Sequence, residues 1–261
     1  MSRRSRRSET SSSTARERLL ARQRAILIHL SDPATYESTN TRRAEALQGI
    51  DVERLKVLGR LILAKRISKI ESLLPATCRC ASAHVPALMK EFAVACPPHS
   101  LGRQDNALQF HDFVLAYEGA PTPPNYLADL VRLEYLAATV TLAARDQPPR
   151  SPFADLDSTW TAFEVRMSPG LQLFETEFDL RAALGDSPPP ALERGRPRQI
   201  AIVHAATEVR VFSLEEEIVR LLFDVEEWSR IDARRQEGVR SVVESLAGRG
   251  LLEVRPCGYA S

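Results

Sequence analysis

Apolar residues recur at helical spacing through the first half of the chain. The expected helices cover residues 15–30, 51–74, 84–95, 105–117 and 125–144. Asp51, Asp105 and Asn125 can each cap a helix start, and Pro75 can end the longest of these helices. The pattern therefore predicts an all-helical first domain.

Two faces of these helices are informative. The helix after Asp105 carries an apolar stripe made of Phe110, Phe113, Val114 and Tyr117. The helix after Asp51 has a basic face opposite its apolar positions. That face carries Arg60, Lys65, Arg66 and Lys69, and we interpret it as solvent-exposed.

The pattern changes after residues 146–152, a polar, proline-rich segment that predicts a linker. Residues 162–167 alternate between apolar and polar, as a half-buried strand does, and residues 171–174 follow as a second strand after a turn. A short helix is expected over Leu180–Leu184. A hairpin of residues 199–204 and 209–212 comes next.

The hairpin is followed by helices and a final strand. Ser213 and Glu216 fit a capping box, which predicts a helix that buries Ile218, Leu221, Leu222 and Val225. A last helix should bury Val239, Val242, Val243 and Leu246. Residues 251–254 then return as a strand, so the second domain has a winged-helix-like order of elements.

The predicted fold class is α+β, with an all-helical N-terminal domain followed by a small winged-helix-like, peptide-recognition α+β domain. Residues 1–14, rich in Arg and Ser, are expected to be a disordered tail. The helical domain should span residues 15–147 and the α+β domain residues 153–261.

Composition and charge limit the possible partners and the location of the chain. The chain is 44% hydrophobic, with a formal net charge of +1, so it has no overall attraction to nucleic acid or membranes. No apolar run is long enough to cross a bilayer or to form a signal-peptide core, and we therefore expect no membrane association and a cytoplasmic location. The four cysteines should then be free thiols.

No catalytic constellation is recognisable in the sequence. Phosphate-binding loops, nucleophile elbows and His-Glu-x-x-His helices are missing, and the five histidines are scattered. Cys78-Arg79-Cys80 is a lone pair of cysteines, whereas a structural zinc site needs about four ligands. We therefore predict no catalytic residue, no metal ligand and no cofactor in this chain, and do not expect it to be an enzyme by itself.

Two binding functions remain open. An edge strand beside a helix can accept an extended peptide as an additional strand. The expected peptide contacts are Val209, Arg210, Val211, Phe212 and Arg240. The alternative is a DNA-binding transcriptional regulator, in which arginines near the last helix contact phosphates, although Glu237 and Glu244 dilute that charge.

Two segments of the helical region resemble a known family. They are Phe110-His111-Asp112-Phe113-Val114 and Pro124-Asn125-Tyr126-Leu127-Ala128-Asp129-Leu130-Val131-Arg132-Leu133-Glu134-Tyr135. They resemble the partner subunits of multinuclear non-heme iron-dependent oxidative (MNIO) enzymes, a family that includes the partner proteins of methanobactin and thiaglutamate biosynthesis. Asn125 and Tyr135 depart from the usual Pro and Trp of that family.

The resemblance implies a specific role. Iron would be held by a TIM-barrel enzyme that forms a heterodimer with this chain, and not by this chain. The helical domain would dock on that enzyme, while the second domain would bind the precursor peptide and present its cysteine for modification, in peptide-derived natural product biosynthesis.

Aromatic residues of the helical region have two interpretations, the domain's own core or contact with the enzyme. Interfaces are enriched in tyrosine, so some of them are candidates for contact. The candidate partner-interface residues are Phe113, Tyr117, Tyr126, Arg132, Glu134 and Tyr135.

Overall fold

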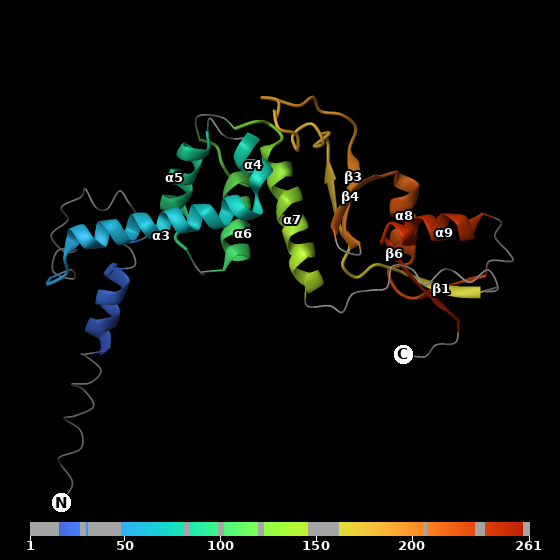
Figure 1. Cartoon of the computed structure of the whole chain (residues 1–261), viewed down its shortest axis with the longest axis horizontal. Helices are drawn as coiled ribbons and strands as arrows, with labels where there is room; N and C mark the ends of the chain where they lie inside the picture. Colours follow the sequence, from blue (N-terminus) through green and yellow to red (C-terminus); the bar gives the residue numbers. More distant parts are fainter. Residues whose placement is uncertain are drawn as a thin grey trace, which may run out of the picture. The chain divides into compact units, whose positions relative to one another are not determined.

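A computed structural model gives the fold of the chain. The described residues are 16–26, 30, 48–80, 84–98, 102–119, 123–145, 162–205, 208–232 and 238–257. They divide into two compact units, Met1–Pro123 and Pro124–Ser261 (Figure 1). The helices gather toward the N-terminus and the strands toward the C-terminus, which confirms the α+β class.

The first unit is helical throughout its described part. Residues 16–26 form one helix. The others are α3 (Val52–Leu73), α4 (Pro75–Cys80), α5 (Val85–Ala95) and α6 (Arg103–Leu115). Asp51 caps α3 as predicted, because its carboxylate accepts hydrogen bonds from the backbone N–H groups of Glu53 and Arg54.

The start of α6 corrects one prediction. Asp105 does not cap this helix, which begins earlier, with Gly102 in the capping position. Asp105 instead lies in the first turn, where a carboxylate is stabilised by the positive end of the helix dipole.

An arginine lies inside the first unit. Arg66 is buried, which corrects its expected place on a solvent-exposed face. Its Nε donates to Asn106 Oδ1 (2.8 Å), Nη1 to the Cys96 carbonyl (2.6 Å) and Nη2 to Gln109 Oε1 (3.0 Å). The guanidinium also lies 4.1 Å from the centroid of the Phe92 ring. A buried cation is costly unless it is hydrogen-bonded. The acceptors that Arg66 needs come from α6 and from the end of α5, so these contacts connect α3 to both helices.

The second unit contains three helices and two small sheets in its described part. The helices are α7 (Leu127–Arg145), α8 (Glu216–Asp224) and α9 (Val239–Gly248). The strands are β1 (Ala162–Met167), β2 (Gln172–Thr176), β3 (Arg198–Ala205), β4 (Glu208–Leu214), β5 (Ser229–Asp232) and β6 (Leu252–Pro256). One sheet has the order β5-β1-β6 and the other β2-β3-β4, and all pairs are antiparallel.

Helix α7 belongs to this second unit, whereas the sequence pattern places it in the helical domain, which was expected to extend to residue 147. It packs against β2, β3 and β4. Thr176 donates a 2.5 Å hydrogen bond to Asp129 of α7, and the Arg132 guanidinium lies 5.5 Å from the Phe174 ring centroid. The apolar side of α7 is removed from water because it packs on one face of the sheet β2-β3-β4.

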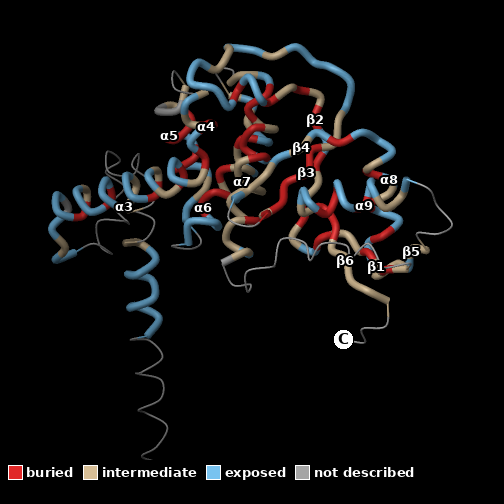
Figure 2. The backbone as a smooth tube through the Cα atoms, turned by 45° about the vertical axis from the view of Figure 1, so that its right-hand side comes forward, coloured by how far each residue is buried: buried red, intermediate tan, exposed pale blue. Residues whose placement is uncertain are grey.

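The main core of the second unit lies between β1, β3 and the helices α8 and α9. Figure 2 shows the buried residues of β3 in red, and β3 is the most continuously buried strand. Its Ala201 and Val203 pack with Phe163 and Val165 of β1. Helices α8 and α9 close this core with five buried residues, Val219, Leu222, Val243, Leu246 and Ala247.

Several local predictions for this unit are wrong. Ser213 does not cap α8, because β4 continues to Leu214 and Glu215 takes the capping position without a side-chain bond. Residues 180–184 form turns and not a helix. Asn125 does not cap α7, since its amide binds both peptide groups of Leu192. Strand β5 was not expected, although β1 and the hairpin strands were.

Candidate functional site

Strand β4 lies at the edge of its sheet and pairs only with β3. In an antiparallel edge strand, alternate residues direct their N–H and C=O groups away from the sheet. Its residues Val209, Arg210, Val211 and Phe212 are the peptide contacts predicted from the sequence. The structure places all four together on this edge.

The two faces of β4 meet different surroundings. Arg210 and Phe212 pair with Val203 and Ala201 and so lie on the face of the main core. Phe212 packs against that core, and the Arg249 guanidinium lies 5.8 Å from its ring centroid. The opposite face carries Val209, Val211 and Ser213.

A small pocket of about 70 Å³ opens beside this opposite face. Its walls come from α7, from β3 and β4, and from the loop between β2 and β3. The lining residues are Leu133, Phe178, Asp179, Leu180, Arg181, Leu184, Arg198, Ile200, Val211 and Ser213. Val211 is 43% exposed, so an apolar wall of the pocket continues onto the strand edge.

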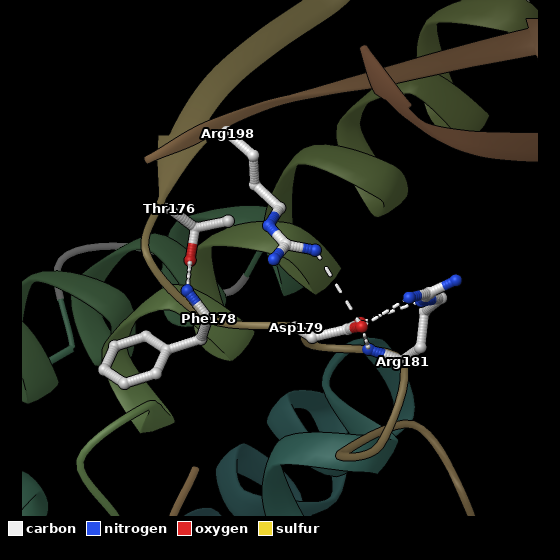
Figure 3. A network of polar contacts seen from close by, with 5 residues as sticks. All are labelled: Thr176, Phe178, Asp179, Arg181 and Arg198. Atoms are coloured by element: carbon white, nitrogen blue, oxygen red, sulfur yellow. Dashed lines mark hydrogen bonds and ion pairs between the residues drawn. The ribbon is translucent and has the colours of Figure 1, made fainter. Parts of the chain in front are cut away.

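Charged side chains are among those that line the pocket, and Figure 3 shows the contacts between them. Asp179 Oδ1 accepts a 2.8 Å hydrogen bond from Arg181 Nε, and Arg181 Nη2 donates to Asp179 Oδ2. Arg198 Nη1 lies 3.8 Å from Asp179 Oδ2. The hydrogen bonds from Arg181 lower the pKa of Asp179 from its ordinary 3.8 to about 2. Two guanidinium groups therefore contact one carboxylate. The net charge of the three groups is positive, which favours an anionic group of a ligand.

The loop that carries this network is held in place by hydrogen bonds. Thr176 Oγ1 donates to Asp129 and accepts from the Phe178 backbone N–H at 3.1 Å. Gly195 N–H donates to the Glu177 carbonyl at 2.7 Å. These bonds fix both ends of the loop, so Asp179 is presented on a positioned backbone.

A larger cleft, of about 390 Å³, lies elsewhere in the same unit. It is formed by α8, α9 and the inner face of the sheet β5-β1-β6. Its lining residues are Val165, Leu221, Val225, Ile231, Gly238, Val239, Val242, Val243 and Leu252. None of these side chains is charged or can form a hydrogen bond, so this cleft suits an apolar group. Val242, expected in the core, is 41% exposed here.

The fifth predicted peptide contact, Arg240, lies on α9 and not on β4. It is half-buried and is not among the residues that line either pocket. The described surface of α9 is mixed in charge, because Glu244 lies between Arg240 and Arg249. This mixture does not favour the nucleic-acid alternative, which needs a basic recognition helix.

The predicted partner-interface residues divide between the two units. In the first, Phe113 is half-buried and packs its ring 5.5 Å from Phe92 and 5.3 Å from Tyr117. In the second, Tyr126 is fully buried and donates a hydrogen bond to the Pro189 carbonyl at 2.5 Å. Tyr126 thus holds the loop between β2 and β3 in place.

The other three predicted contacts lie on α7. Arg132 is exposed, whereas Glu134 and Tyr135 are half-buried. The structure therefore does not gather the six residues into one patch within either unit.

Trp228 is an aromatic residue with two arginine neighbours. The guanidinium groups of Arg166 and Arg255 lie 4.7 and 4.0 Å from its ring centroid. The two arginines form cross-strand ion pairs with Glu253 and Glu164, each at 2.6 Å. All charges in this cluster are paired, so it stabilises the outer face of the sheet β5-β1-β6.

Sequence reasoning missed the Asp179 network. Asp179 and Arg181 are close in sequence, but Arg198 enters from the start of β3. Nothing in the sequence pattern indicates that pairing. Among the described residues, no group of three or more His, Cys, Asp or Glu side chains gathers as a metal site would require.

Comparison with known proteins adds no relative. No family model matches the sequence, and no curated protein matches it. Within the described part of the chain, no helix has both the length and the apolar character needed to span a bilayer.

Proposed function

We propose that this chain is the non-catalytic partner subunit of an iron-dependent oxidative peptide-modifying enzyme, and that it binds the precursor peptide as an added strand on β4. The observation that carries the peptide-binding part is the edge of β4, whose exposed Val211 continues into the pocket beside Arg181 and Arg198. The resemblance of residues 110–114 and 124–135 to MNIO partner proteins supports the identity of the enzyme.

An extended peptide fits the edge by a simple geometry. Its backbone would pair with the outward N–H and C=O groups of β4, each hydrogen bond contributing about 0.5–1.5 kcal/mol. Its side chains would then alternate between the two faces of the sheet. A side chain on the Val211 face reaches the pocket, where Arg198 and Arg181 favour a carboxylate beside a small apolar group.

In this proposal the chemistry belongs to the partner. The TIM-barrel enzyme would hold the iron and oxidise a cysteine of the peptide. This chain would supply affinity and would fix the peptide's register, because pairing to a strand defines which residue reaches the enzyme.

A tagged chain purified from its native host tests the partnership. We expect a TIM-barrel iron protein in near-equal amount, identified by mass spectrometry, with iron in the complex. Recovery of nucleic acid without any protein partner would instead support the DNA-binding alternative and overturn the proposal.

The peptide recovered with the complex tests the binding mode. Single N-methyl groups are placed along that peptide, and affinity is measured by fluorescence anisotropy. Strand addition predicts that every second N-methylation weakens binding at least tenfold, whereas those between have little effect, because only alternate N–H groups face β4. An effect without a period of two would contradict pairing to a strand.

Arg181→Gln tests the charged side of the pocket, with Arg194→Gln as the matched control. Both arginines are exposed on the same loop, but only Arg181 lines the pocket. We expect weaker peptide binding for Arg181→Gln alone, with a smaller salt dependence. Equal effects of the two substitutions would show that the pocket does not contact the peptide.

A further inference from the structure

Helix α3 has two apolar faces, and only one of them is packed. Leu55 and Ile70 are buried with Arg66 on the inner face. On a different side of the helix, Val57, Leu58 and Leu61 are 55%, 46% and 62% exposed. An amphipathic helix usually carries one apolar stripe, so a second one is a candidate interaction surface.

The exposed residues form a continuous stripe. Positions 54, 57, 58, 61 and 65 follow the helical spacing of three and four residues, so they lie on one side of α3. Its apolar part, Val57 to Leu61, spans about 6 Å, or roughly one turn, and the charged residues extend this side of the helix to about 17 Å, at 1.5 Å per residue. Arg54 and Lys65 occupy its two ends.

The surroundings of the stripe are basic. Arg54, Arg60 and Lys65 are exposed. Arg54 pairs with Asp51 at 3.3 Å, but among the described residues neither Arg60 nor Lys65 forms an ion pair. Glu53, the acidic residue of this part of α3, is already paired with Lys56 at 2.7 Å. The excess charge on the stripe is therefore positive.

The helix of residues 16–26 has the same character. Leu19 and Leu20 are 57% and 44% exposed, and four arginines accompany a single glutamate in this segment. An isolated helix of this length is only marginally stable in water. Its residues 16–24 are all exposed, and Arg22 donates a 3.1 Å hydrogen bond to the Gln48 carbonyl, just before α3.

We propose that the stripe of Val57, Leu58 and Leu61 on α3 docks an acidic amphipathic α-helix of a protein partner. Leucines of the partner would pack along the stripe, and its glutamates or aspartates would meet Arg60, Lys65 and Arg54. A second copy of this chain fits worse, because its own stripe is basic and like charges would meet. A membrane fits worse as well, because α3 is held by its buried face and only three apolar side chains could insert.

Two designed helical peptides of equal length provide the probe. They share one leucine face, which is flanked by glutamates in the first peptide and by lysines in the second. Anisotropy is measured with the full-length chain. We expect the glutamate peptide to bind at least tenfold more tightly than the lysine peptide, and its affinity to fall with added salt.

A double substitution, Leu58→Ser with Leu61→Ser, tests the location. Both side chains are exposed, so the fold should survive, which circular dichroism checks. Leu115→Ser is the control, because Leu115 is a comparably exposed leucine (56%) on α6 of the same unit. Binding of the glutamate peptide should fall at least tenfold in the double variant and stay unchanged in the control.

Several results would overturn the proposal. These are equal binding of the two peptides, no binding of either, or an equal loss in the Leu115 control. Binding to phosphatidylserine vesicles without binding to the glutamate peptide would assign the stripe to a membrane surface. Self-association in sedimentation that the double substitution abolishes would assign it to a second copy.

Discussion

Arg66→Met is the most direct test of what holds the first unit together. Methionine keeps the length of the aliphatic stem of Arg66, but it removes all the donors together with the guanidinium that lies over the Phe92 ring. The variant then lacks the three hydrogen bonds of 2.6 to 3.0 Å that the guanidinium donates to Asn106 Oδ1, Gln109 Oε1 and the Cys96 carbonyl. Asn106 is only 2% exposed, so water cannot replace the lost donor there.

The magnitude follows from these contacts. An unsatisfied buried acceptor costs about 1–3 kcal/mol, and the two less buried acceptors add roughly 1 kcal/mol between them. Removing a buried cation offsets part of this loss, since burial penalises the charge and lowers the pKa of Arg66 below its usual value. We expect Arg66→Met to lower the free energy of unfolding by about 2–3 kcal/mol.

Chemical denaturation followed by two probes checks the prediction. Far-UV circular dichroism reports the helices of both units, whereas tryptophan fluorescence reports the second unit alone, since Trp160 and Trp228 both belong to it. A helix transition that shifts without a shift in fluorescence therefore belongs to the first unit. Arg60→Met is the matched control, because Arg60 is exposed on the same helix and should change stability by no more than about 0.5 kcal/mol. An Arg66→Met chain as stable as the control would refute the structural role of the network.

Two further predictions concern the second unit. The pKa of Asp179 in the folded chain, about 2, lies below its ordinary 3.8, so the carboxylate stabilises the fold above about pH 3.8 and this contribution is lost as the pH falls through 2. Asp179→Asn should therefore lower the free energy of unfolding at pH 7 by less than about 1 kcal/mol, because Arg181 is exposed, and should lower it less near pH 2. Melting temperatures of the variant and the parent chain at the two pH values check this, and an equal change at both would contradict the pairing. Gly250→Ala should cost more than Gly238→Ala. Both residues have positive φ, which costs an alanine about 1–2 kcal/mol, but only at Gly250 would the new Cβ lie 3.2 Å from Ala205 Cβ. Urea denaturation compares them, and equal losses would show that Ala205 moves freely.

Under the proposed function, the edge of β4 must not pair with another copy of the chain when no peptide is bound. Glu208 and Arg210 place opposite charges on this strand, 2.9 Å apart. Charged side chains on an edge strand hinder pairing with another copy of the chain. A peptide ligand can still use the edge when it brings complementary charge, which is consistent with the positive pocket beside Val211.

Local signals in the sequence were sufficient for several elements. The alternation in residues 162–167 predicted β1 with its bounds, because a half-buried strand needs an apolar side chain at every second position. The cap at Asp51 was predicted for a similar reason, since the carboxylate reaches the N–H groups of its own next residues. The edge position of Val209–Phe212 also followed from the hairpin pattern.

Tertiary structure decided what depends on distant partners. The sequence showed that α7 is a helix but not that it would cover β2, β3 and β4, because an apolar helix face matches many surfaces equally well. The burial of Arg66 was hidden for the same reason, since its acceptors come from residues 30 to 43 positions away. The charged lining of the pocket beside β4 likewise depends on folding, which brings Arg198 to Asp179. The sequence determined the elements through interactions between near neighbours, and the packing of those elements determined the sites.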